Sequence, residues 1–172
     1  MGRKEHELWQ EVMGRREFKK VTLGEYFSQG IADDPKRVLF SLSHYKFAKK
    51  LIGDGKEILE VGCTDGLGTT ILEKNSKSVV AIDFDERAIE AAKESFKDKN
   101  IEFRSMDFLG AKLGEFDAIV SLDVIEHIYP ENEDLFFKTI TDNLKEYGIG
   151  IIGTPNINAS KYASEGSEIG HV

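Results

Sequence analysis

Residues 57–83 read EILEVGCTDGLGTTILEKNSKSVVAID, and this stretch decides the fold. The apolar run over 57–61 predicts a short buried strand, and SVVAID over 78–83 predicts a second one. The loop between them, over 62–68, holds three glycines and leads into a predicted helix. Glycine permits a positive φ and a close approach of the backbone, which a strand-to-helix turn over a ligand requires. The stretch therefore predicts one strand–loop–helix–strand unit of a parallel sheet.

Similar patterns extend this unit in both directions along the chain. Before it, Asp34 and Pro35 predict the start of a helix, which Gly53 ends. Short strands that alternate with amphipathic helices predict an α/β fold with a doubly wound, mostly parallel sheet. After residue 83, the predicted elements are a helix capped by Asp85, strands over 100–103, 116–122 and 149–153, and a helix over 130–147.

The chain divides into three predicted parts. Residues 1–34 form an N-terminal segment that is helical or acts as a lid, and residues 35–156 form the sheet domain. Residues 157–172 show no helix or strand pattern. We expect this tail to be the start of a C-terminal part that the sequence does not contain.

The composition excludes several classes of protein. The 172 residues carry 31 acidic side chains against 23 Lys and Arg, a formal charge of -8 that argues against a nucleic-acid surface. A hydrophobic content of 40% is too high for a disordered chain, and no apolar run approaches the roughly 20 residues of a membrane span. The single cysteine, Cys63, and an N-terminus without a signal peptide predict a reducing, cytoplasmic compartment, with neither nucleic acid nor membrane as partner.

Acidic residues stand where the predicted strands end. Ligands of parallel sheets bind at the carboxyl ends of the strands, and Asp83, Asp107 and Asp123 occupy these ends. Asp83 follows Gly62 by 21 residues, which is the position of a carboxylate that accepts hydrogen bonds from two ribose hydroxyls. The loop lacks the Lys-Thr or Lys-Ser pair of a P-loop, and its glycine spacing differs from that of dinucleotide-binding folds. These features predict a site for a nucleoside-containing cofactor.

Several segments, in the right order, resemble the motifs of class I S-adenosylmethionine-dependent methyltransferases of the small-molecule type. Residues 60–66 (EVGCTDG) resemble the family's first motif, approximately acidic-V-G-C-G-x-G, with Thr64 in place of the middle glycine. The resemblance covers about residues 35–156 and implies a Rossmann-like S-adenosylmethionine-binding domain with strand order 3-2-1-4-5, without the family's last two strands. The other matching segments are Asp83 after strand two, Asp107-Phe108 after strand three, Phe116–Ile128 around strand four and Leu144–Asn156 around strand five.

The resemblance also implies a role for each residue that contacts the cofactor. S-adenosylmethionine is the expected methyl donor, and S-adenosylhomocysteine is the product that it leaves. By this resemblance, the methionine part is held by Glu60 and the backbone at Gly62, Cys63 and Gly66, the ribose by Asp83, the adenine by Phe84, Asp107 and Phe108, and Leu122 approaches the cofactor from strand four.

The segment Asp123–His127 (DVIEH) follows strand four and has three interpretations. Histidine is the side chain best suited to exchange a proton at neutral pH, so we predict that His127 is catalytic and takes a proton from a hydroxyl or amine of the acceptor. Alternatively, Asp123, Glu126 and His127 present the oxygen and imidazole ligands of a divalent metal. In the third interpretation, the Glu-His pair is a structural hinge of the family. We assign no metal to the site.

The resemblance implies methyl transfer to an oxygen or nitrogen of a small polar molecule. Residues 23–52 resemble methyltransferases found with surface-polysaccharide enzymes, which makes a sugar or polysaccharide precursor the first choice of acceptor. Two alternatives stay open: a non-catalytic or truncated S-adenosylmethionine-binding module, and an enzyme of nucleotide sugars or NAD. The apolar fifth strand, over 149–153, is expected at an exposed sheet edge, where it favours a homodimer.

Overall fold

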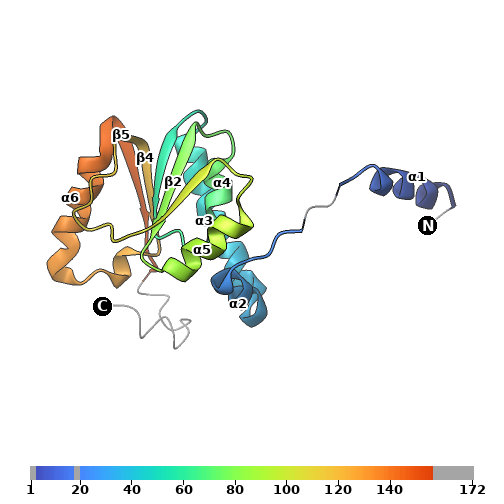
Figure 1. Ribbon diagram of the computed structural model, residues 1–172, viewed down its shortest axis with the longest axis horizontal. Coiled ribbons are helices and arrows are strands. Elements are labelled where there is room, and N and C mark those ends of the chain that lie inside the picture. The colour runs from blue at the N-terminus through green and yellow to red at the C-terminus, as the bar shows by residue number, and fades with distance from the viewer. Residues whose placement is uncertain (1–2, 18–19, 157–172) are drawn as a thin grey trace.

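A sheet of five parallel strands forms the centre of the molecule (Figure 1). The computed structural model describes residues 3–17 and 20–156. The strand order is β3-β2-β1-β4-β5, which confirms the predicted order. The strands are β1 (Glu57–Val61), β2 (Ser78–Asp83), β3 (Ile101–Ser105), β4 (Phe116–Leu122) and β5 (Leu144–Gly153).

Helices cover both faces of this sheet, which confirms the predicted doubly wound fold (Figure 1). The central strand β1 contributes to both layers of core, because successive residues of a strand point to opposite faces. Ile58 packs on the α3 side and Leu59 on the α6 side, and both are fully buried. Full burial of such a side chain contributes about 1.5–3 kcal/mol. The helices are α3 (Pro35–Ile52), α4 (Thr69–Glu73) and α5 (Glu86–Ser95) on one face, and α6 (Glu133–Asn143) on the other.

Two of these helices begin at an aspartate that caps them, as predicted. Asp34 accepts a hydrogen bond from the backbone N–H two residues further along (3.0 Å) and so caps α3. Asp85 accepts from the N–H groups of Arg87 (2.9 Å) and Ala88 (3.3 Å) at the start of α5. A cap of this kind stabilises a helix by about 1 kcal/mol. Since Asp85 lies two residues after Asp83, its cap fixes the start of α5 beside the end of β2.

The helix predicted over 130–147 is wrong at both ends. Its first three residues form a 3₁₀ turn, and α6 spans only Glu133–Asn143. The helix ends where the buried side chain of Asn143 forms bonds outside it, with Oδ1 accepting from the N–H of Leu113 (2.6 Å). β5 then begins at once, with an irregular stretch around Tyr147, whose φ of 67° breaks a helix. The predicted fifth strand is the second half of β5.

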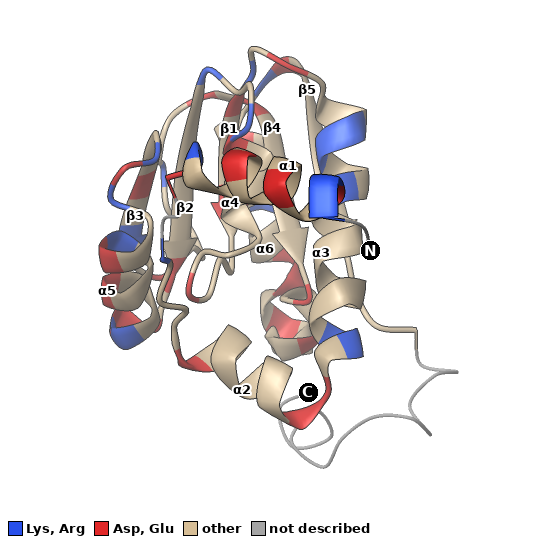
Figure 2. Ribbon diagram, turned by 90° about the vertical axis from the view of Figure 1, so that its right-hand side faces the viewer, with Lys and Arg blue, Asp and Glu red and all other residues tan. Residues whose placement is uncertain are grey.

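Two helices precede the sheet domain, α1 (Arg3–Gly14) and α2 (Glu25–Asp33). α1 buries none of its residues and lies apart from the sheet in Figure 1. α2, which the sequence pattern does not separate from its surroundings, packs against α3 and lies at the carboxyl end of the strands (Figure 2). Within residues 3–17 and 20–156, no helix has the length and apolar character needed to cross a membrane. The predicted tail, 157–172, lies outside the described residues.

Candidate functional site

The glycine loop between β1 and α4 has the shape that its sequence predicts. Gly62 and Gly66 both have a φ of 80°. A Cβ on Gly62 would stand 2.3 Å from a methyl carbon of Val124, so only glycine is accommodated there. Thr64 also has a positive φ (47°), at the position where the family motif has a glycine. A side chain in this conformation costs roughly 1–2 kcal/mol, which the rest of the loop must offset.

Asp83 supplies part of that support. Its carboxylate, 8% exposed at the end of β2, accepts the N–H of Thr64 at Oδ2 (2.8 Å) and the N–H of Asp85 at Oδ1 (2.9 Å). The acid therefore lies directly against the glycine loop, as the spacing of 21 residues predicts. Each carboxylate oxygen retains a second lone pair, so the same group has capacity for two hydroxyl donors.

The backbone N–H groups of the loop have partners of their own. Those of Gly62 (2.9 Å) and Cys63 (3.1 Å) donate to the carbonyl of Ile82, and that of Gly66 donates to the carbonyl of Cys63 (3.0 Å). The predicted contacts of these residues with a ligand must then come from their Cα and carbonyl groups. Cys63 is fully buried, and burial raises the pKa of its thiol, so the side chain serves as core.

Glu60 is a buried carboxylate at the end of β1. It is 1% exposed, and burial raises its pKa to about 7. The hydroxyls of Thr69 and Tyr45 lie close enough to oppose this shift, while the charge of Asp83 adds to it. Within the described residues neither carboxylate oxygen completes a hydrogen bond, so the neighbouring hydroxyls satisfy it only in part.

Glu60 belongs to a group of buried oxygens that lack hydrogen-bond partners. Burying such an atom without a partner costs about 1–3 kcal/mol, and each case in a folded protein needs an explanation. All of the buried side-chain oxygens without a partner among residues 3–17 and 20–156 lie in one region. This region consists of the carboxyl ends of β1 and β4, the glycine loop and the start of α4. The oxygens are both carboxylate oxygens of Glu60, Oδ1 of Asp65, and the hydroxyls of Thr69 and Ser121.

The charged residues at this end of the sheet are predominantly acidic (Figure 2). Acidic groups gathered at one site raise the local concentration of cations and repel anions. The arrangement thus favours a ligand that carries positive charge and hydrogen-bond donors. The acids are Glu60, Asp65, Asp83, Asp85, Asp107, Asp123 and Glu126.

The three residues predicted to contact the adenine have different surroundings. Phe84 is 82% exposed just beyond β2, so its ring is available to a planar ligand. Phe108 is 6% exposed, and its ring meets that of Phe136 edge-on with 5.7 Å between the centroids. Its side chain is therefore part of the core, and only its backbone can reach a ligand. Asp107 is exposed after β3, where Oδ1 accepts the N–H of Leu109 (2.9 Å).

The segment after β4 turns sharply away from the sheet. Leu122 ends the strand half-buried, and Asp123 has a φ of 55° while its N–H donates to the carbonyl of Gly153 (2.8 Å). His127 ends a 3₁₀ turn over Ile125–His127 and is exposed.

Glu126 lies beside His127 and accepts a hydrogen bond from the hydroxyl of Thr154 (3.3 Å). Partial burial raises the pKa of its carboxyl, and the charge of Asp123 adds to this shift. Across the described part of the chain, no group of three His, Cys, Asp or Glu residues is arranged to hold a metal ion.

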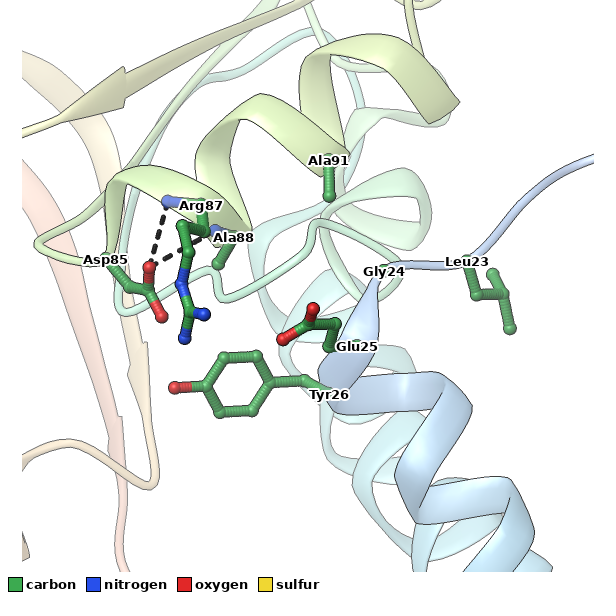
Figure 3. Close-up of a pocket in the computed structure, with 8 residues that line it drawn as sticks. All are labelled: Leu23, Gly24, Glu25, Tyr26, Asp85, Arg87, Ala88 and Ala91. Carbon is green, nitrogen blue, oxygen red and sulfur yellow. Dashed lines mark hydrogen bonds between the residues drawn. The ribbon is translucent and has the colours of Figure 1, made fainter.

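A pocket of about 240 Å³ lies between α2 and the start of α5 (Figure 3). Tyr26 reaches from α2 toward Asp85 and Arg87, and partial burial followed by the charges of Asp85 and Asp83 raises the pKa of its phenol. None of the predicted site residues lines this pocket, although the lining includes Asp85, the predicted cap of α5. Its lining residues are Leu23, Gly24, Glu25, Tyr26, Asp85, Arg87, Ala88 and Ala91.

Known proteins share this fold and parts of the sequence. Residues 58–148 match the methyltransferase domain family. The ubiquinone biosynthesis O-methyltransferase of Rickettsia canadensis is 34% identical over 117 residues, which cover 66% of this chain and 47% of that protein. The ribosomal protein L11 methyltransferase of Thermosipho africanus is 33% identical over 119 residues, or 67% of this chain and 44% of that protein. The chain thus spans about half the length of these curated relatives.

Solved structures agree on the architecture. An S-adenosylmethionine-dependent methyltransferase from Clostridium acetobutylicum superposes with a TM-score of 0.62 at 20% identity, covering 71% of this chain and 53% of that one. The N-methyltransferase NodS from Bradyrhizobium japonicum, in complex with S-adenosylhomocysteine, gives a TM-score of 0.58 at 22% identity, with coverage of 68% and 60%. At these identities the likeness establishes the fold, a Rossmann-like methyltransferase core.

Proposed function

The chain belongs to the class I S-adenosylmethionine-dependent methyltransferase family, and we propose that it methylates an oxygen or nitrogen of a small polar molecule. The observation that carries the proposal is the buried carboxylate of Glu60 beside the glycine loop, neither of whose oxygens completes a hydrogen bond among the described residues. Such oxygens fit the methionine ammonium of S-adenosylmethionine, which brings both hydrogen-bond donors and a positive charge.

The surrounding residues fit the remaining parts of this cofactor. Asp83 lies where ribose hydroxyls are expected, with a lone pair left on each oxygen. Phe84 and Asp107 are exposed beyond the next two strands and would meet the adenine, with Phe108 contributing backbone. When bound, S-adenosylmethionine supplies a methyl group already activated on its sulfonium. The chain's own contribution is therefore mainly to orient the reactants and to exclude water.

His127 is the residue that we assign to proton transfer. It follows β4, whose end we place next to the methyl group, on the other side of β1 from Asp83. The similar proteins include an O-methyltransferase and an N-methyltransferase, and both kinds of acceptor lose a proton on methylation. We retain a sugar or polysaccharide precursor as the acceptor, on the resemblance of residues 23–52.

Calorimetry can test the place of Glu60 in the site. Because the pKa of Glu60 is raised to about 7, much of it is protonated in the free protein near neutral pH. An ammonium group beside it would lower that pKa, so binding of S-adenosylhomocysteine at about pH 6 should release most of one proton. Titrations in two buffers of different ionisation enthalpy measure this release. Glu60→Gln should release no proton when it binds S-adenosylhomocysteine. Equal proton release by wild type and Glu60→Gln would place Glu60 outside the site.

The raised pKa of Glu60 also predicts how the stability of the ligand-free protein depends on pH. The carboxyl of Glu60 has a higher pKa in the fold than its ordinary 4.5. Its contribution to stability is thus fully present below about pH 4.5 and is lost as the pH rises through about 7, a change of about 3 kcal/mol. Denaturant titrations should therefore show that wild type loses stability relative to Glu60→Gln over this interval.

We further propose that the outer edge of β5 joins two copies of the chain. Among the described residues β5 pairs only with β4, and the strand exposes Ile149 and Ile152. α3, which packs against β4 and β5, exposes Phe40 and Phe47. An open apolar edge of this kind recruits another strand.

Light scattering should then give the mass of a dimer that dissociates on dilution. Ile152→Lys should give a monomer, since a charge on an edge strand blocks pairing. Lys138→Ala, on the exposed side of α6, serves as the control. A wild-type monomer at every concentration would contradict the edge proposal.

A further inference from the structure

Asp65 belongs to the glycine loop but forms its bond with a distant helix. Its side chain is 1% exposed, and Oδ2 accepts the backbone N–H of Phe27 (3.0 Å), 38 residues earlier in the chain. Burial raises the pKa of this carboxyl, while the N–H groups of Phe27 and Tyr26 oppose the rise. Oδ1 lacks a partner within the described chain. Burying a carboxylate is costly unless hydrogen bonds offset that cost, and the bond from Phe27 supplies part of the compensation here.

Phe27 is the third residue of α2, whose first N–H groups have no acceptor within the helix. The residue before the helix, Gly24, has no side chain with which to cap it. Asp65 therefore caps α2 from the loop. Gly24 also approaches Asp65 so closely that a Cβ on it would lie 2.4 Å from the Cβ of Asp65. The absence of a side chain at Gly24 thus permits the contact that the cap requires.

This cap determines where Tyr26 lies. Tyr26 is the second residue of α2, and its ring points toward Asp85 and Arg87 across the pocket (Figure 3). Partial burial raises the pKa of its phenol, and the charges of Asp85 and Asp83 add to the rise. The hydroxyl of Ser95 donates to the carbonyl of Thr22 and holds the preceding segment against α5. The start of α2 is thereby fixed beside α5, the helix that begins just beyond the acid that we assign to the ribose.

We propose that Asp65 is a positioning residue that caps α2 from the glycine loop and so holds Tyr26 beside Asp85, which starts α5 two residues beyond the ribose acceptor Asp83. The cap links the shape of the loop to the placement of α2, so each depends on the other. A ligand held by the loop would then be bound more tightly when α2 is in place. This last step rests on the proposed binding of S-adenosylmethionine, whereas the cap itself does not.

Amide hydrogen exchange on the protein without ligand tests the cap. In Asp65→Ala, the amide of Phe27 should exchange at least about fivefold faster than in wild type, the value expected for loss of a helix cap. Asp65→Asn should restore the protection, because its amide oxygen still accepts a hydrogen bond. Asp33→Ala, an exposed acid at the other end of α2, is the matched control and should leave Phe27 protected. Unchanged protection at Leu59 in the core shows that each variant folds.

Calorimetry with S-adenosylhomocysteine tests the positioning. Tyr26→Phe should weaken binding about threefold to tenfold in wild type, the loss expected for one hydrogen bond. In the Asp65→Ala background, Tyr26→Phe should cause no further loss of affinity, because the cap no longer holds α2 in place. Equal losses in both backgrounds, or a Phe27 amide that exchanges at the wild-type rate in Asp65→Ala, would overturn the proposal. If no form of the chain binds S-adenosylhomocysteine, the proposed function fails, and the exchange rates still decide whether Asp65 caps α2.

Discussion

Replacing His127 with alanine is expected to slow methyl transfer by about 10²–10⁴-fold, the usual cost of losing a general base. The affinity for S-adenosylhomocysteine should not change, because the residues assigned to the nucleoside lie beyond β2 and β3, on the other side of β1. His127 is exposed after β4, where an acceptor can reach it. The rate is measured as formation of S-adenosylhomocysteine from S-adenosylmethionine with a panel of small sugars and amines.

The same variant separates the other interpretations of His127. If the histidine were a structural hinge, His127→Ala would lower the melting temperature and leave the rate of the folded fraction intact. If it were a metal ligand, EDTA would abolish activity, Mg²⁺ would restore it, and Glu126→Ala would match His127→Ala. His6→Ala, on the exposed helix α1, is the matched control. Unchanged turnover by folded His127→Ala would remove the residue from the catalytic assignment.

The parts of the fold that are encoded locally could be predicted from the sequence. The apolar runs of β1 and β2 and the caps at Asp34 and Asp85 depend on neighbouring residues, and the structure confirms them. The end of α6 could not be predicted, because Asn143 bonds to Leu113, 30 residues earlier. The start of α2 also depends on a residue from another part of the chain, since its cap is Asp65.

The candidate site likewise contains residues that local sequence predicts and residues that it does not. The acids at the strand ends could be located because parallel strands bring their carboxyl ends to one edge of the sheet. Phe84 and Phe108 look alike in sequence, since each directly follows an aspartate that lies at or just beyond the end of a strand. One is exposed and the other buried because Phe108 meets Phe136 on α6, a contact that no local pattern encodes. The position of Tyr26 beside Asp85 is not encoded locally either, because α2 receives its cap from Asp65 in the glycine loop.

Replacing Asp83 with alanine should weaken binding of S-adenosylhomocysteine by tenfold to a hundredfold. The change removes a charged acceptor of two hydroxyls, a loss of about 1.5–3 kcal/mol. It also frees the N–H of Thr64, whose positive φ the carboxylate supports. Asp83→Asn keeps an acceptor oxygen and should fall between wild type and alanine. Asp142→Ala, an exposed acid on α6, should bind as wild type does.

The central claim is that this chain binds S-adenosylmethionine through the glycine loop and Asp83. Its most direct test is a calorimetric titration of wild type and Asp83→Ala with S-adenosylhomocysteine, and of wild type with NAD. We predict binding of one S-adenosylhomocysteine per chain, a loss of at least about tenfold in Asp83→Ala, and no binding of NAD. Equal affinity of the two proteins for S-adenosylhomocysteine, or binding of NAD in its place, would contradict the claim.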